Sequence, residues 1–148
     1  MFTKSNKAIA KRFFDEVCNA RRLDVANELF SPDHRATDPS IPDIPPGPGG
    51  QQQVLSTYQA AFPDVHWHVE EMIAEGDKVV TRWTARGTHK AELKGNPPIP
   101  PTGKQAEVSG IWIHRMAGGK IVETWVVWDT LGLLKQLGVI PQEETMAA

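Results

Sequence analysis

The sequence has little of what several classes of protein depend on. It contains one cysteine, Cys18, so no internal disulfide can form, and its helical surroundings favour a buried packing residue. No stretch approaches the roughly 20 consecutive apolar residues that a membrane-spanning helix needs, and the chain begins without the apolar run of a signal peptide. Lys and Arg (16) nearly balance Asp and Glu (18), so the net charge of -2 lacks the basic surplus on which nucleic-acid binding relies. We expect a cytoplasmic protein with no nucleic-acid or membrane partner.

Motifs for several chemistries are also absent. There is no glycine-rich phosphate loop, no Gly-x-Ser-x-Gly nucleophile turn and no cysteine pair for zinc or redox chemistry. His66 and His68 have the spacing that places two imidazoles on one face of a strand, but no third ligand stands at a recognisable spacing. These absences disfavour nucleotide-dependent and covalent mechanisms, and we expect no metal site.

Length and a hydrophobic content of 40% suit one domain over residues 1–148. The first half of this domain is predicted to be mostly helical. Apolar residues recur at intervals of three and four over 5–19, which predicts an amphipathic helix. A second helix is predicted over 24–30, where the following Ser-Pro-Asp ends it. Prolines and glycines make 39–50 a loop, and a third helix is predicted over 51–62.

Beyond the third helix the hydrophobic period becomes alternating, which is typical of half-buried strands. Gly76 and Asp77 stand at the tip of a first hairpin, and a proline-rich loop separates it from a second hairpin. A short helix follows Asp129. The sequence thus predicts an α+β fold of three helices and about four long antiparallel strands. The predicted strands cover 64–73, 79–89, 106–116 and 120–128.

The second hairpin decides which side chains share a face of the sheet. A three-residue loop over 117–119 places Trp112 opposite Thr124, whereas a two-residue loop would reverse the two faces. With the three-residue loop, one face carries Trp112, His114, Thr124, Val126 and Trp128, and the other carries Ile111, Ile113, Glu123, Trp125 and Val127. The second set makes an apolar outer surface, which predicts a homodimer through that face.

Three ionisable residues near strand ends are candidates for acid–base catalysis. Asp129 either caps the short helix or acts as an acid or base. His114, near the hairpin tip, is either solvated or catalytic. His89 ends a strand beside the proline-rich loop, where it either anchors that loop by a hydrogen bond or acts as a general base.

Two more charged residues are candidates for substrate contacts. Asp38 either forms an Asx turn before Pro39 or reaches the mouth of a cavity. Arg82 stands in the middle of a strand, where it either pairs with Glu123 or binds an anionic group of a substrate.

Five tryptophans, at positions 67, 83, 112, 125 and 128, fall in the predicted strands. A small core rarely needs so many indoles, each with an N–H group that needs a partner, so we expect one or two of them, on the face of Trp112 and Trp128, to line a cavity for a ring-bearing ligand. The candidate substrate contacts on these strands are Trp83, Trp112, Thr124, Val126 and Trp128.

Four segments, "VVTRWTARGTHKAELKG", "PPTGK", "GGKIVETWVVWD" and "LGLLKQLG", together resemble the SnoaL-like polyketide cyclases and predicted ester cyclases of the nuclear transport factor 2-like superfamily. Their spacing from "NKAIAKRFFDEVCNARRLD" extends the resemblance over nearly the whole chain. The resemblance implies a cone-shaped, strongly curved antiparallel sheet wrapped around the helices. It also implies a hydrophobic cavity in which acid–base chemistry acts on a carbonyl compound without a metal or organic cofactor.

The resemblance further implies where the family's catalytic groups would stand. Alignment through "GGKI" puts the acid–base aspartate of the last strand at Val126 and its helper histidine at Trp112, so both groups are missing here. Asp129 and His89 match the "WD" and "GTH" patterns of the family, while Thr37 stands where many relatives have histidine.

Three functions remain open at this point. The first is a cofactor-free cyclase or isomerase that acts on a small hydrophobic, polyketide-like carbonyl compound, with His89 and Asp129 as the acid–base pair. The second is a dimerising module that binds a small molecule and has lost the reaction. The third is an epoxide hydrolase-like enzyme, which the same fold can host, although its Asp-Arg-Asp constellation is not recognisable here.

Overall fold

The apolar period at the start of the chain forms a helix that covers the sheet. The computed structural model describes residues 2–95 and 97–140. Helix α1 (Phe2–Arg12) continues into the π-helical segment η1 (Phe13–Asn19), which confirms the first predicted helix. Phe13, Phe14 and Cys18 of η1 are fully buried, because this end of the helix packs against the inner face of the sheet.

The other helices are short or begin earlier than predicted. The second predicted helix divides into the 3-10 turn η2 (Leu23–Val25) and α2 (Ala26–Leu29). Helix α3 (Pro48–Ala61) begins three residues before the predicted start, with a proline in its first turn, where the missing N–H group is not needed. Helix α4 (Thr130–Gln136) follows Asp129, as expected. Among the described residues, no helix is long and apolar enough to cross a bilayer.

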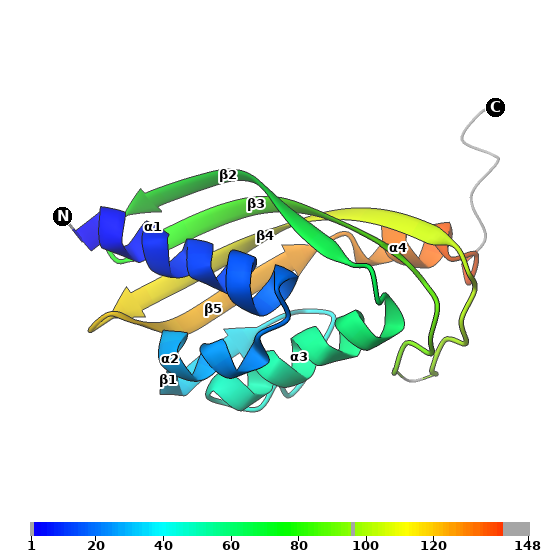
Figure 1. Ribbon diagram of the computed structural model, residues 1–148, viewed down its shortest axis with the longest axis horizontal. Coiled ribbons are helices and arrows are strands. Elements are labelled where there is room, and N and C mark those ends of the chain that lie inside the picture. Colours follow the sequence, from blue (N-terminus) through cyan, green and yellow to red (C-terminus); the bar gives the residue numbers. More distant parts are fainter. Residues whose placement is uncertain (1, 96, 141–148) are drawn as a thin grey trace.

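Five strands form one sheet, and helices α1, α2 and α3 lie against one of its faces (Figure 1). Strands β2 (His66–Glu75), β3 (Lys78–Thr88), β4 (Gln105–Ala117) and β5 (Lys120–Trp128) confirm the four predicted strands. The strand order is β1-β5-β4-β3-β2, with the last four strands antiparallel to their neighbours.

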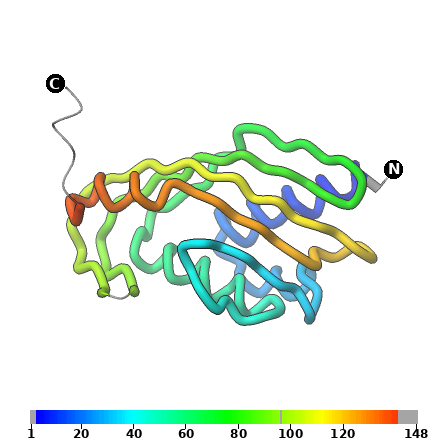
Figure 2. The backbone as a smooth tube through the Cα atoms, turned by 180° about the vertical axis from the view of Figure 1, so that it is seen from behind, coloured from blue at the N-terminus to red at the C-terminus, as the bar shows by residue number. Residues whose placement is uncertain are grey.

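Strand β1 (Phe30–Thr37) was not expected from the sequence, and it changes the sheet from antiparallel to mixed. It pairs in parallel with β5 at the edge of the sheet, beside the last hairpin in Figure 2. Within β1 only Phe30 and His34 are buried, and Pro32 interrupts the stretch, so the alternation that identifies a strand is missing. The pairing itself is irregular between Phe30 and Arg35.

The register of the last hairpin differs from the prediction, but each face of the sheet carries the predicted residues. Our three-residue loop was wrong, because the turn is a two-residue one with Gly118 at φ 58° and Gly119 at φ 77°. Such a turn alone would reverse the faces. Val122 has no partner in the ladder and forms a β-bulge, which shifts the strand by a second residue and restores them. Trp112 therefore pairs with Val126, and both face the helices.

The outer face of the sheet carries the apolar strip that the sequence predicts. Ile111 is 41% and Val127 is 64% exposed, and Ile113 and Trp125 beside them are half-buried. The charged side chains around the strip are paired within the chain, Arg82 with Glu71 and Arg115 with Glu123. A second copy can therefore approach this strip without bringing unpaired like charges together. Homodimer formation through the strip stays a prediction.

We expect Val127→Lys to convert a dimer into a monomer, because a lysine at the centre of the strip would be buried without a partner. Light scattering at micromolar concentration measures the change. Leu131→Lys is the matched control, since Leu131 is 53% exposed but lies on α4 rather than on the sheet. A monomeric wild-type protein, or equal loss of the dimer in both variants, would contradict the assignment.

Candidate functional site

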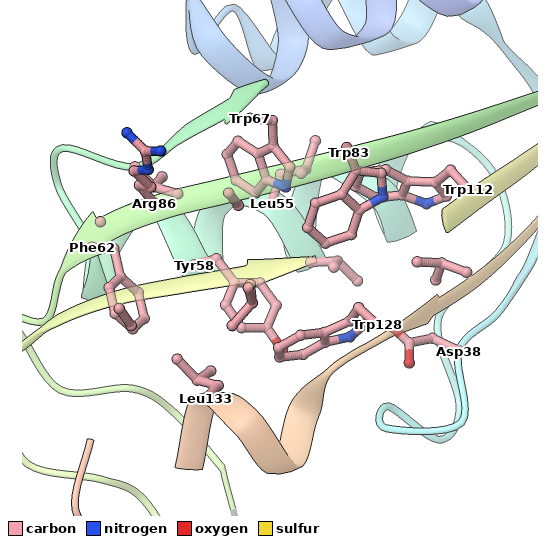
Figure 3. Close-up of a pocket in the computed structure, with 17 residues that line it drawn as sticks. Asp38, Leu55, Tyr58, Phe62, Trp67, Trp83, Arg86, Trp112, Trp128 and Leu133 are labelled. Atoms are coloured by element: carbon pink, nitrogen blue, oxygen red, sulfur yellow. The ribbon is translucent and has the colours of Figure 1, made fainter. Parts of the chain in front are cut away.

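A cavity lies between the inner face of the sheet and helices α3 and α4 (Figure 3). Its volume is about 70 Å³, measured as the space open to the centre of a water molecule, which is several times what one water molecule needs. Alternation along β3, β4 and β5 turns every second side chain toward the inner face, where part of them line the cavity, and α3 closes the opposite side. Six of the residues that line it are aromatic: Tyr58, Phe62, Trp67, Trp83, Trp112 and Trp128.

Gly110 leaves room for two of these tryptophans on the inner face of the sheet. It pairs with Trp83 on β3 and with Trp128 on β5, so the three residues form one row on the inner face. A Cβ atom at position 110 would overlap Cζ2 of Trp83 and lie 2.7 Å from Cβ of Trp128. Because position 110 has no side chain, the Trp83 ring can lie over the backbone of β4.

Among the described residues that line the cavity, Asp38 is the one with a carboxylate. It follows β1 and is 8% exposed. Its Oδ1 accepts hydrogen bonds from the backbone N–H of Ser40 (2.8 Å) and from the Ser40 hydroxyl (2.6 Å). The first of these bonds forms the Asx turn expected before Pro39. Trp128 donates its indole N–H to Ser40 Oγ at 3.2 Å, so the cavity wall and the carboxylate are joined through one hydroxyl.

Tyr58 brings a neutral hydrogen-bond donor to the same cavity. Its ring packs edge-on against Trp128, with 5.7 Å between ring centroids. Burial, and then the negative charge of Asp38, raise the pKa of the phenol to about 12, so the hydroxyl stays protonated at neutral pH. Arg86 also lines the cavity, but its guanidinium pairs with Glu107 at 2.5 Å and points away from the aromatic side chains in Figure 3.

His89 lies behind the cavity wall and anchors the proline-rich loop. The imidazole is fully buried and stacks on Phe62, with 5.2 Å between ring centroids. Its Nδ1 accepts the backbone N–H of Thr102 at 3.2 Å and lies 3.0 Å from the Thr102 hydroxyl. Burial lowers the pKa of His89, so the ring is neutral. Of the two alternatives for His89, the structure shows the hydrogen bond that anchors the loop. His89 is not among the residues that line the cavity.

His114 is buried rather than solvated, which corrects one of its two alternatives. The first helix covers it, because Phe13 packs edge-on against the imidazole at a centroid distance of 5.2 Å. The ring stacks behind Trp112 and does not line the cavity. Burial, and then the neighbouring His34, lower the pKa of His114 to about 3.

Thr124 is the cross-strand partner of His114 and is also buried behind the wall. Its hydroxyl lies 2.7 Å from Nε2 of His34, which comes from β1. Burial lowers the pKa of His34 to about 4. Thr124 is therefore part of a buried polar contact and not of the cavity lining.

Asp129 and Arg82 lie outside the cavity. Asp129 is exposed and caps α4, since its Oδ1 accepts the backbone N–H of Gly132 at 2.9 Å. Arg82 points to solvent on the outer face and pairs with Glu71 at 3.3 Å. The expected pairing of Arg82 with Glu123 was wrong, because Glu71 stands directly opposite Arg82 on β2, while Glu123 pairs with Arg115.

The structure thus brings together only part of the predicted set. Trp83, Trp112, Val126, Trp128 and Asp38 line one cavity, whereas His89, His114, Thr124, Asp129 and Arg82 do not. Tyr58, Phe62 and Trp67 line it as well, although the sequence did not single them out as site residues. For Tyr58, the sequence signal that could have identified it is its phenol, a polar group within the apolar stripe of α3. Among the described residues, no group of three or more His, Cys, Asp and Glu side chains is placed to hold a metal ion.

Comparison with known proteins identifies a family model and solved structures that are similar to this chain. The family model for SnoaL-like polyketide cyclases matches residues 8–137. IdmH from Streptomyces antibioticus is 33% identical and superposes with a TM-score of 0.75, over 90% of this chain and 98% of IdmH. TsrD from Streptomyces laurentii, 24% identical, has a TM-score of 0.82 over 93% of this chain and 97% of its own. A SnoaL-like polyketide cyclase from Agrobacterium tumefaciens, 18% identical, has a TM-score of 0.72 over 90% and 98% of the two chains. No curated protein matches the sequence significantly.

Proposed function

The chain belongs to the SnoaL-like polyketide cyclase family, and from this premise we propose that it is a cofactor-independent enzyme that cyclises or isomerises an apolar carbonyl compound. The observation that carries the proposal is an aromatic cavity whose lining, within residues 2–95 and 97–140, holds one carboxylate, that of Asp38. A ring-bearing ligand fits walls of this kind, and a fixed carboxylate supplies a base.

Asp38 is the general base in this proposal. Both Ser40 hydrogen bonds go to Oδ1, and among the described residues none is donated to Oδ2. Oδ2 takes a proton from the carbon next to a ketone, and the enolate carbon then attacks a second carbonyl of the same molecule. The new alkoxide receives the proton back, so no atom is lost. In an isomerisation, the proton returns to a different carbon.

Tyr58 is the neutral donor of the reaction. Because its pKa is raised to about 12, the phenol keeps its proton and donates a hydrogen bond to the carbonyl that becomes the alkoxide. The positions that the resemblance gives to the family's aspartate and histidine are Val126 and Trp112, which pair with each other in the cavity wall. The acid–base role in this chain therefore falls on Asp38 and Tyr58.

Exchange of α-protons tests the proposal without knowledge of the natural substrate. In deuterated buffer, the protein is expected to accelerate exchange at the acidic carbon of 2-tetralone, followed by proton NMR. Acceleration over buffer supports a base in the cavity. Binding of 2-tetralone without acceleration would contradict the catalytic role and favour the binding-module alternative, which rests on the missing family aspartate and histidine at Val126 and Trp112. An epoxide hydrolase-like activity has less support, because the guanidinium of Arg86 points away from Asp38 (Figure 3).

We expect Ser40→Ala to lower the exchange rate by about 10-fold to 100-fold with little change in the affinity for 2-tetralone. The variant frees the carboxylate to turn away from the substrate carbon, and a misplacement of about 1 Å costs on the order of 10²-fold in rate. Ser40→Thr keeps the hydroxyl and is expected to restore most of the rate. Equal losses in the alanine and threonine variants would show that the hydroxyl does not position Asp38.

A further inference from the structure

Buried polar atoms without partners are concentrated at one place in the molecule. Among the described residues, seven buried side-chain nitrogen and oxygen atoms lack a hydrogen bond. Five of them belong to four neighbours on the inner face of β3 and β4: Thr81, Trp83, Trp112 and His114. Native proteins leave few such groups unpaired, and a cluster of them calls for a partner such as a ligand or water.

Two of these four residues line the cavity. Trp83 and Trp112 form its wall, and their ring centroids are 5.3 Å apart. Figure 3 shows the nitrogen atoms of both indoles toward the same end of the cavity as the Asp38 carboxylate, while Phe62 and Leu133 lie toward the other end. Thr81 and His114 lie behind the wall, where Thr81 pairs with Trp112 across the strands. The cavity therefore has a polar end and an apolar end.

We propose that the polar end is a subsite for a carbonyl oxygen, which accepts hydrogen bonds from the indole N–H groups of Trp83 and Trp112. This subsite rests on the proposed function, because the cavity is taken as the substrate site. Both nitrogens are shielded in the present arrangement, so the oxygen reaches them when an indole turns about its bond to Cβ. The enolate oxygen formed beside Asp38 would receive the same two donors.

The charges around the subsite select the class of ligand. Two indole N–H groups donate without carrying charge, and the charge of Asp38 repels anions. The guanidinium of Arg86 is already paired with Glu107 and points away, so it does not offset a carboxylate or phosphate on the ligand. The ligand is therefore a neutral, ring-bearing ketone or quinone, with its carbonyl at the Trp83 and Trp112 end and its hydrocarbon part against Phe62 and Leu133.

Matched probes test this subsite by binding alone. 1-Tetralone and tetralin have nearly the same shape and differ in the carbonyl. We expect the wild-type protein to bind the ketone about tenfold more tightly, the contribution of a good neutral hydrogen bond. The double variant Trp83→Phe/Trp112→Phe is expected to bind both probes equally. Trp125→Phe, which removes an indole from the outer face, is expected to keep the tenfold preference.

The carbonyl stretching frequency of bound 1-tetralone gives a second measurement that packing alone would not change. We expect it to fall on binding to the wild-type protein and to return toward its value in an apolar solvent in the double variant. Equal affinity of the wild-type protein for both probes, or a preference that survives in the double variant, would overturn the subsite. Asp38→Asn is expected to keep the preference for the ketone, because it leaves both indoles in place. A wild-type protein that prefers the ketone but does not catalyse exchange would contradict the proposed function and still support the subsite.

Discussion

We expect Asp38→Asn to lower the exchange rate of 2-tetralone by about 10²-fold to 10⁴-fold, which is what a positioned general base contributes. Asparagine has nearly the shape of aspartate and can still accept the Ser40 hydrogen bonds, so the loop after β1 is expected to keep its form. The affinity for 2-tetralone should therefore change little, and the effect should fall on the rate of proton transfer. Proton NMR in deuterated buffer measures the rate, and calorimetry measures the affinity.

Two variants outside the cavity serve as controls for this result. Asp129→Asn keeps a good helix cap and removes an exposed carboxylate, and His89→Ala removes the imidazole that anchors the proline-rich loop. We expect the first to leave the exchange rate unchanged and the second to act mainly on stability. A loss in Asp129→Asn equal to that in Asp38→Asn would contradict the assignment of the base.

We also expect the protein to lose about 4 kcal/mol of unfolding free energy between pH 7 and pH 5. His34 and His114 are neutral in the folded protein, because burial lowers their pKa values from 6.5 to about 4 and about 3. In the unfolded chain both take up a proton as the pH falls through 6.5, so the unfolded state binds more protons and stability declines. Each contributes about 2 kcal/mol over this interval, which is large beside a typical total of 5–15 kcal/mol.

Urea unfolding at a series of pH values measures this loss. The range from pH 7 to pH 5 separates the histidines from the carboxylates, which titrate mostly below it. We expect His114→Leu to remove about half of the part that His34 and His114 contribute, at little cost at pH 7, because neither ring nitrogen has a partner to lose. His34→Gln is the second variant, and the exposed His68→Gln is the control. An unchanged slope in both buried variants would contradict this origin of the acid sensitivity.

Most of the secondary structure could be predicted from the sequence because it follows periodicity. The first helix, which carries Phe13, Phe14 and Val17, and the four alternating strands were found this way. Strand β1 was not, because its pairing depends on β5, which lies about 90 residues further along the chain, and its own pattern is that of a loop. The bulge at Val122 was missed for the same reason, since it is a property of the pairing of two strands and not of either strand alone.

The cavity could be predicted in part because it is built on the same alternation. Trp83, Trp112 and Val126 follow from which residues share a face of the sheet. His114 shares that face, but whether a residue near a hairpin tip meets solvent or a helix is decided by packing, and here Phe13 covers it. The contribution of Tyr58 depends in turn on how α3 approaches the sheet, which local patterns do not determine.

The two-residue turn and the bulge at Val122 compensate for each other in the register of the last strand. Each reverses the inward and outward sides of the last strand, and only the two together leave Val126 and Trp128 inside. Loss of one residue at either place would turn the residues of this strand that line the cavity toward water and turn those of the outer strip inward. The hairpin can therefore change length without turning the last strand over only by two residues, or by one residue at each of the two places.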